Sequence, residues 1–211
     1  MRLKHLTAVL MTALFAVSGC AGIGATKADS QNTYQKMQAI FTNVRSYACE
    51  ATVEYKSNKG SNVYDTTQKC KTTGEYRVEV VGPDNVSGNV TLSDGKTIYQ
   101  YNKRISGKIS VATKESQERS EIFFTSFIKN YLKSAETSMS AAKVEGDPCT
   151  VFEALIPGTH PYLASEKLWI DNQTLKPVKL IIYDPQGSER IIVTYKTFDY
   201  NVEIDDSEFK V

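Results

Sequence analysis

Histidine is nearly absent from this chain, which has only His5 and His160 among 211 residues. Zinc sites, Ser-His-Asp triads and Cys-His pairs normally need one or more histidines. His160 lies in the sequence Pro157-Gly158-Thr159-His160-Pro161, which is typical of an exposed loop. The sequence therefore predicts no catalytic residues of its own, no metal site and no cofactor site.

The chain also lacks an excess of charge of either sign, with 25 basic and 24 acidic residues. Removal of residues 1–19 would take away Arg2 and Lys4, leaving 23 basic residues (25 − 2) and a net charge of about −1. A surface so balanced gives no electrostatic reason to bind nucleic acid or an anionic membrane face. We expect neither as a partner.

No apolar run is long enough to cross a bilayer, which takes roughly 20 residues. The longest, from Leu6 to Val17, follows a basic start and ends in Val17-Ser18-Gly19-Cys20. This order is typical of a bacterial lipoprotein signal, although an ordinary secretion signal is the alternative. We predict a signal peptide over residues 1–19, lipidation of Cys20 with anchoring on the outer face of a membrane, and a flexible stalk through residue 32.

Residues 33–211 fit a single domain with a sizeable core. Apolar residues recur at helical spacing from Tyr34 to Tyr47, which predicts an amphipathic helix. Short alternating segments separated by turn residues then predict an antiparallel meander. The expected strands are 47–56, 75–80, 89–92, 97–102, 149–156, 167–171, 177–183 and 191–195.

A second helix is expected over residues 116–134, with Ser116 or Ser120 as its N-cap. Its apolar stripe is broad and rich in aromatic residues. Because a meander with one apolar face needs a cover, we expect this helix to supply it. The residues expected to cover the cavity are Phe123, Phe124, Phe127 and Tyr131.

Cys49 and Cys70 lie on the two arms of a predicted hairpin. Centring the turn between Lys59 and Gly60 would place residues whose numbers sum to 119 opposite one another, so the two cysteines would face each other. An exported protein can keep a disulfide there, although cross-strand bridges are often strained and a reducing host would leave free thiols. Cys149 is expected to be a small buried strand residue.

Two carboxylate pairs are available for glycosidase chemistry, Asp205 with Asp206 and Glu50 with Glu54. The first pair lies close to the C-terminus, and the second belongs to the solvated face of a strand. Neither position suggests a pocket.

Three stretches resemble the LolA-type lipoprotein-carrier superfamily over about residues 33–209. They are Val44-Arg45-Ser46-Tyr47 before a long strand, the strand Asp94-Gly95-Lys96-Thr97-Ile98-Tyr99-Gln100-Tyr101, and Leu168-Trp169-Ile170-Asp171 followed by Leu175-Lys176-Pro177. The chain closes with Tyr195-Lys196-Thr197-Phe198-Asp199-Tyr200-Asn201-Val202 and Asp205-Asp206-Ser207-Glu208-Phe209. With these stretches included, the chain within that superfamily most resembles the GerS-type germination lipoproteins of spore-forming bacteria.

The resemblance implies an α+β fold, with a strongly curved antiparallel sheet, an incomplete β-barrel, whose concave face is covered by helices. It also implies a non-enzymatic protein that binds and activates the zinc-dependent CwlD N-acetylmuramoyl-L-alanine amidase in making muramic-δ-lactam of spore cortex peptidoglycan. A strand-swapped homodimer and a location on the outer forespore membrane are further expectations from the family.

The alternative is a LolA-like lipid- or lipoprotein-binding protein, or an envelope-sensing lipoprotein. A cavity filled by the aromatic helix would argue against a ligand, whereas an open cavity of several hundred Å³ would favour one.

Overall fold

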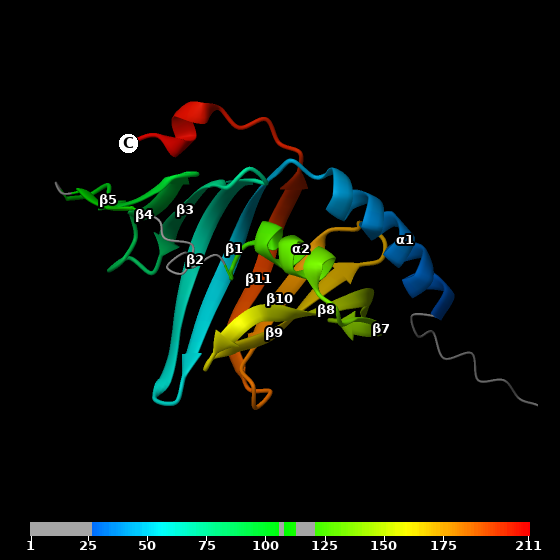
Figure 1. Ribbon diagram of the computed structural model, residues 1–211. Helices are drawn as coiled ribbons and strands as arrows, with labels where there is room; N and C mark the ends of the chain where they lie inside the picture. Colours follow the sequence, from blue (N-terminus) through cyan, green and yellow to red (C-terminus); the bar gives the residue numbers. More distant parts are fainter. Residues whose placement is uncertain (1–26, 106–107, 113–120) are drawn as a thin grey trace, which may run out of the picture.

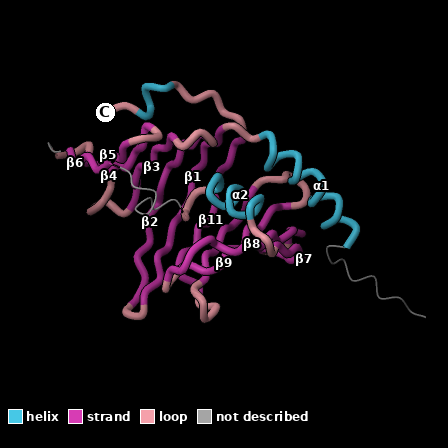
Figure 2. Tube along the Cα trace, in the orientation of Figure 1, coloured by secondary structure: helices cyan, strands magenta, loops and turns pink. Residues whose placement is uncertain are grey.

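The computed structural model describes residues 27–105, 108–112 and 121–211, so the expected signal peptide and Cys20 lie outside the described part. Within it, eleven strands form one antiparallel sheet in the order β6-β5-β4-β3-β2-β1-β11-β10-β9-β8-β7 (Figures 1 and 2). The strands are β1 Ser46–Ser57, β2 Gly60–Lys71, β3 Glu75–Gly82, β4 Asn89–Asp94, β5 Thr97–Asn102, β6 Lys108–Ala112, β7 Thr137–Val144, β8 Asp147–His160, β9 Leu163–Asp171, β10 Pro177–Tyr183 and β11 Glu189–Tyr200.

The sheet consists of two meanders, β1 to β6 and β7 to β11, that are joined where β1 pairs with β11. Tyr47 lies opposite Tyr200 at one end of this pairing, and Tyr55 lies opposite Ile191 at the other. Because β6 and β7 are the two outermost strands and do not pair with each other, the sheet is open.

Both helices, α1 Lys27–Asn43 and α2 Phe124–Lys133, pack against one face of the sheet, here called the inner face (Figure 1). Phe41 of α1 is central to the contact, since its ring lies 6.0 Å from that of Phe124 and 5.4 Å from that of Phe152 on β8. Fully buried aromatic side chains of this kind each contribute a large apolar area. The main core therefore lies between the helices and β1, β8, β9, β10 and β11.

On β4 the buried side chains point to the opposite, outer face. Leu92 is paired with Arg77, whose side chain points away from the core, yet Val90 and Leu92 are only 1% and 0% exposed. The C-terminal segment covers this region, because the short 3-10 helix η1 Asp206–Phe209 contacts β3 and β4 and buries Phe209 (Figure 1). The sheet thus has a small second core on its outer face.

The expected fold class is confirmed: the chain is α+β, with an open antiparallel sheet and two helices, and every expected strand is present. The first helix begins at Lys27, inside the expected stalk, because Ser30 and Thr33 are buried although they are polar. The second helix begins only at Phe124, with Phe123 as its N-cap and no side-chain cap. The expectation that Ser116 or Ser120 caps it is wrong, and both residues lie outside the described part.

Candidate functional site

The inner face carries a cavity of about 1040 Å³ beside the helices, over strands β1 to β5. The cross-strand register places Val78, Thr91 and Gln100 in one row across this face, and pairs Asn89 with Asn102 in the next. The described lining residues are Val53, Tyr55, Asn62, Tyr64, Thr66, Tyr76, Val78, Val80, Val86, Asn89, Val90, Thr91, Ile98, Gln100, Tyr101, Asn102, Ile105, Ile122 and Phe123.

The helix α2 fills only one side of the inner face. Phe124, Phe127 and Tyr131 are buried in the main core, whereas Phe123, together with Ile122, forms a wall of the cavity. The ring of Phe123 lies 4.7 Å from that of Tyr76 on β3, at the boundary between the filled and open sides. The four aromatic residues that the sequence assigned to a cover thus leave an open cavity on the other half of the sheet.

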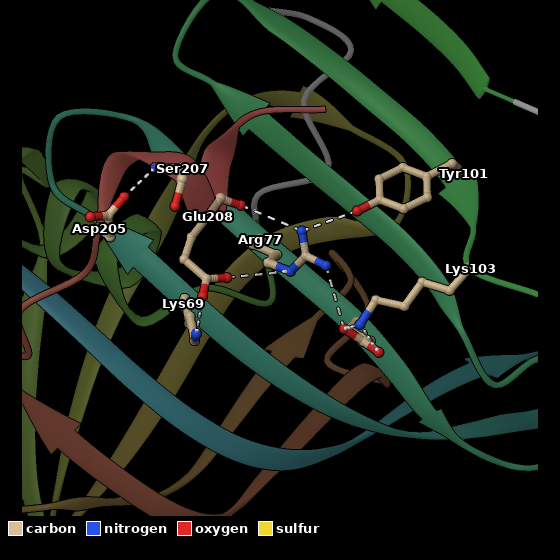
Figure 3. A network of polar contacts seen from close by, with 8 residues as sticks. Lys69, Arg77, Tyr101, Lys103, Asp205, Ser207 and Glu208 are labelled. Atoms are coloured by element: carbon tan, nitrogen blue, oxygen red, sulfur yellow. Dashed lines mark hydrogen bonds and ion pairs between the residues drawn. The ribbon is translucent and has the colours of Figure 1, made fainter.

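A polar network on the outer face fastens the C-terminal segment to β3 (Figure 3). The Arg77 guanidinium donates to the hydroxyl of Tyr101 at 3.1 Å and lies 3.8 Å from Oε2 of Glu208. Lys69 binds the other carboxylate oxygen of Glu208 at 2.9 Å, and Asp205 caps η1 by accepting from the backbone N–H of Ser207 at 2.7 Å. These ion pairs hold the pKa of Glu208 below its ordinary value, mainly through the Lys69 contact.

Glu166 is a buried carboxyl group on the inner face of β9, beneath α2. Its Oε1 accepts a hydrogen bond from Nδ2 of Asn130 at 2.8 Å, while Oε2 has no hydrogen-bond partner among the described residues. Burial raises the pKa of Glu166 to about 7, because the charged form loses its hydration there. Sequence reasoning missed this residue, since a single glutamate in an alternating strand looks like a solvated position.

The hairpin register differs from the prediction for the cysteines. Strands β1 and β2 meet at Ser57 and Gly60 around a two-residue turn, so opposed residues sum to 117, and Cys49 faces Gln68 while Cys70 faces Tyr47. The prediction that the two cysteines are directly opposed is therefore wrong, because the residue opposite Cys49 lies two positions before Cys70. Both are free and buried, and burial raises the pKa of Cys49 well above its ordinary value and that of Cys70 to about 12.

The remaining sequence candidates do not come together in one site. His160 is exposed at the β8–β9 hairpin, where its Nδ1 accepts from the backbone N–H of Tyr162 at 3.2 Å. Asp206 pairs with Lys71 at 2.5 Å, so the C-terminal acidic pair holds the C-terminal segment in place. Cys149 is buried on β8, as expected.

The described part of the chain has neither a cluster of metal-binding side chains nor a membrane-spanning helix. Residues 27–105, 108–112 and 121–211 hold no group of three or more His, Cys, Asp or Glu side chains placed to bind a metal ion. No helix in the same ranges has both the length and the apolar character needed to cross a membrane.

The fold belongs to a class already seen in solved structures. An uncharacterized conserved protein from Thermus thermophilus superposes with a TM-score of 0.52 at 11% identity, over 86% of this chain and 93% of that chain. A LolA superfamily protein from Nitrosomonas europaea matches with 14% identity and a TM-score of 0.44, over 86% of this chain and 97% of that one. The Thermus protein supports the fold alone.

The chain belongs to the sporulation protein YdcC-like family, whose model matches residues 3–209. It is also similar to a chain in the structure of the CwlD amidase from Clostridioides difficile in complex with the GerS lipoprotein. The identity is 30%, with 83% of this chain and 96% of that chain covered and a TM-score of 0.49. The resemblance to GerS-type lipoproteins read from the sequence is confirmed by this identity. A comparison with curated proteins gives no match.

Proposed function

We propose that this chain is a membrane-anchored, non-enzymatic lipoprotein that spore germination requires. In this proposal it binds and activates a CwlD-type N-acetylmuramoyl-L-alanine amidase, which acts in muramic-δ-lactam formation in the spore cortex. The observation that carries the proposal is the 30% identity over 96% of a chain solved with the CwlD amidase. Membership of a sporulation protein family along residues 3–209 supports the same role.

The zinc ion and the reacting water would belong to the amidase partner. This division of labour fits a sequence in which His160 is the only histidine after the signal peptide. The lipoprotein would then act through a protein interface, by holding the amidase in its active state.

Cell biology offers the first test of this role. Deletion of the gene is expected to yield spores whose cortex muropeptides lack muramic-δ-lactam and which do not germinate. Cortex of normal lactam content in the deletion strain would contradict the proposal.

Anchoring through Cys20 is part of the proposal, on the outer face of the membrane and, during sporulation, on the outer forespore membrane. A Cys20→Ser variant is expected to move from the membrane fraction to the soluble fraction. Retention of that variant in the membrane would exclude the lipid anchor.

A strand-swapped homodimer is also proposed. The two edge strands, β6 and β7, present unpaired backbone groups that a second copy can pair with at low cost. Light scattering on the purified chain from residue 21 is expected to give twice the monomer mass. A monomer at all concentrations would rule the dimer out.

The open cavity favours a second candidate function, that of a LolA-like lipid- or lipoprotein-binding or envelope-sensing lipoprotein. Its volume of about 1040 Å³ lies at the upper end of the range of roughly 300–1,000 Å³ found for small-molecule sites. Native mass spectrometry of the protein purified from its host would detect a retained lipid. If no lipid is retained, the amidase-binding function is favoured over the lipid-binding function.

A further inference from the structure

The part of the cavity over β1 to β5 that the structure describes has an uncharged lining. Among its described lining residues there is no Asp, Glu, Lys, Arg or His, although charged residues make up 23% of the chain. A phosphate or carboxylate ligand is held most strongly by basic side chains, which offset its negative charge as well as its lost hydration. This neutral lining therefore argues against an anionic ligand.

The lining is nevertheless rich in hydrogen-bonding groups. Four carboxamides and two threonine hydroxyls belong to it. Asn102 already donates to Oδ1 of Asn89 at 2.7 Å, and the Thr66 hydroxyl donates to the backbone carbonyl of Ala51 at 3.0 Å, so the amides of Asn62 and Gln100 supply most of the remaining hydrogen-bonding capacity. Gln100 and Asn62 are exposed, and neither side chain makes a hydrogen bond to any described residue. The amides are Asn62, Asn89, Gln100 and Asn102, and the hydroxyls are those of Thr66 and Thr91.

Aromatic rings flank these amides. The rings of Tyr55 and Tyr64 meet edge to face at 6.1 Å on β1 and β2, and those of Tyr76 and Phe123 lie 4.7 Å apart at the wall beside α2. Aromatic faces provide rigid apolar surface at a low cost in conformational entropy. The cavity thus offers both apolar faces and amide hydrogen bonds.

An acyl chain suits these two positions poorly, because it would bury the amides of Asn62 and Gln100 without a partner, and each such group costs about 1–3 kcal/mol in proteins. A pyranose ring suits it better, since its apolar C–H face stacks on aromatic rings while its hydroxyls bind amides. An N-acetyl group adds one donor and one acceptor that match the side chains of Asn and Gln.

We propose that the cavity over β1 to β5 binds neutral N-acetylated sugar units of a glycan strand, such as the N-acetylglucosamine units of peptidoglycan. This inference rests on the proposed function, because it supplies the reason why an amidase-binding lipoprotein would hold a sugar. A muramic-δ-lactam residue is neutral as well, since cyclisation converts the lactyl carboxyl into an amide. The lipoprotein would then retain the modified strand beside the enzyme.

The test uses chitohexaose as the neutral N-acetylated probe, added to the soluble chain from residue 21 and followed by calorimetry. This chain keeps every residue that the structure describes. Gln100→Glu places a charge in the cavity at an exposed position and is expected to weaken binding about tenfold or more. Asn62→Ala is expected to weaken it by a similar factor, and Gln186→Glu, on the exposed β10–β11 turn, serves as the matched control.

Two results would overturn the proposal. One is the absence of chitohexaose binding by the unmodified chain at millimolar concentration. The other is binding that Gln100→Glu and Asn62→Ala leave unchanged, which would place the sugar elsewhere. Oleate in place of chitohexaose tests the lipid alternative, and tight oleate binding that the sugar cannot displace would favour it.

The same variants separate this inference from the proposed function. If Gln100→Glu loses chitohexaose binding but still forms the amidase complex, both proposals stand. If the unmodified chain binds chitohexaose but forms no complex with the amidase, the proposed partner is refuted and the glycan site stands. An amidase complex without any sugar binding would refute the glycan site alone.

Discussion

Asn130 on α2 donates a hydrogen bond from Nδ2 to Oε1 of Glu166 on β9 at 2.8 Å, and so ties the helix to the sheet through a carboxyl group with 0% exposure. Its second oxygen meets no donor among the described residues. The proton on this carboxyl group is therefore expected to affect how firmly α2 stays in place.

Burial raises the pKa of Glu166 from 4.5 to about 7, so the folded chain holds this proton more tightly than the unfolded chain does. The stability that results is complete below about pH 4.5 and is lost as the pH rises through 7. A shift of this size corresponds to roughly 3 kcal/mol. Urea unfolding between pH 5 and pH 8 measures this loss of stability, and the Glu166→Gln variant is expected not to show it. An unchanged pH dependence in the variant would show that Glu166 does not titrate in this range.

The aromatic contacts of α2 predict a large difference between two positions on one helix. Phe127 has 0% exposure and lies 6.1 Å from the ring of Phe41, whereas Leu132 is 52% exposed. Phe127→Ala is expected to lower the free energy of unfolding by about 3–5 kcal/mol. Leu132→Ala should change it by less than about 0.5 kcal/mol. Similar losses in the two variants would mean that α2 does not pack as described.

Arg77 is predicted to be the main polar anchor of the C-terminal segment, because its side chain is only 14% exposed and contacts both Tyr101 and Glu208. Arg77→Ala should destabilise the chain by about 2 kcal/mol and speed hydrogen exchange in residues 203–211. Lys176→Ala breaks a more exposed pair with Asp199 and should cost less than about 1 kcal/mol. Unchanged exchange in the C-terminal segment of Arg77→Ala would contradict this assignment.

The three described cysteines are predicted to be free thiols. Cys49, Cys70 and Cys149 are all buried, and burial raises the pKa of each. Alkylation without reductant is expected to label all three in denaturant and none within minutes in the native state, as mass spectrometry can show. If the unreduced chain takes up only one label after unfolding in denaturant, two of the three cysteines form a disulfide.

Much of the sheet could be predicted from alternation, because β1, β3, β9 and β11 each bury every second residue over much of their length. The two edge strands could not be predicted in this way. Strand β7 buries almost nothing, since its residues are small or polar and face solvent on both sides. Its existence depends on pairing with β8, which a local pattern does not reveal.

The hairpin register shows how a correct element can still give a wrong contact. The sequence predicted a turn over residues 58–61, but the turn consists of Asn58 and Lys59, and moving the turn centre by one residue moves every cross-strand pair. The opposition of Cys49 and Cys70 depended wholly on that choice.

The sequence left open whether the aromatic helix fills the cavity, for a related reason. Sequence reasoning took one face of the meander as apolar throughout, but β4 buries Val90 and Leu92 on the outer face under Phe209, which leaves Asn89 and Thr91 on the inner face. One local signal was available, because residues 86–93 and 97–102 carry no charge. The cover from the C-terminal segment is a long-range contact and could not be inferred locally.

The central claim is that this chain binds and activates an amidase, and a titration tests it most directly. The soluble chain from residue 21 would be added to the CwlD-type amidase of the same organism, while light scattering, zinc content and amidase activity are recorded together. The account predicts a complex of fixed stoichiometry whose activity exceeds that of the amidase alone and saturates at that ratio. Two proteins that stay separate, with amidase activity unchanged at every ratio, would contradict it.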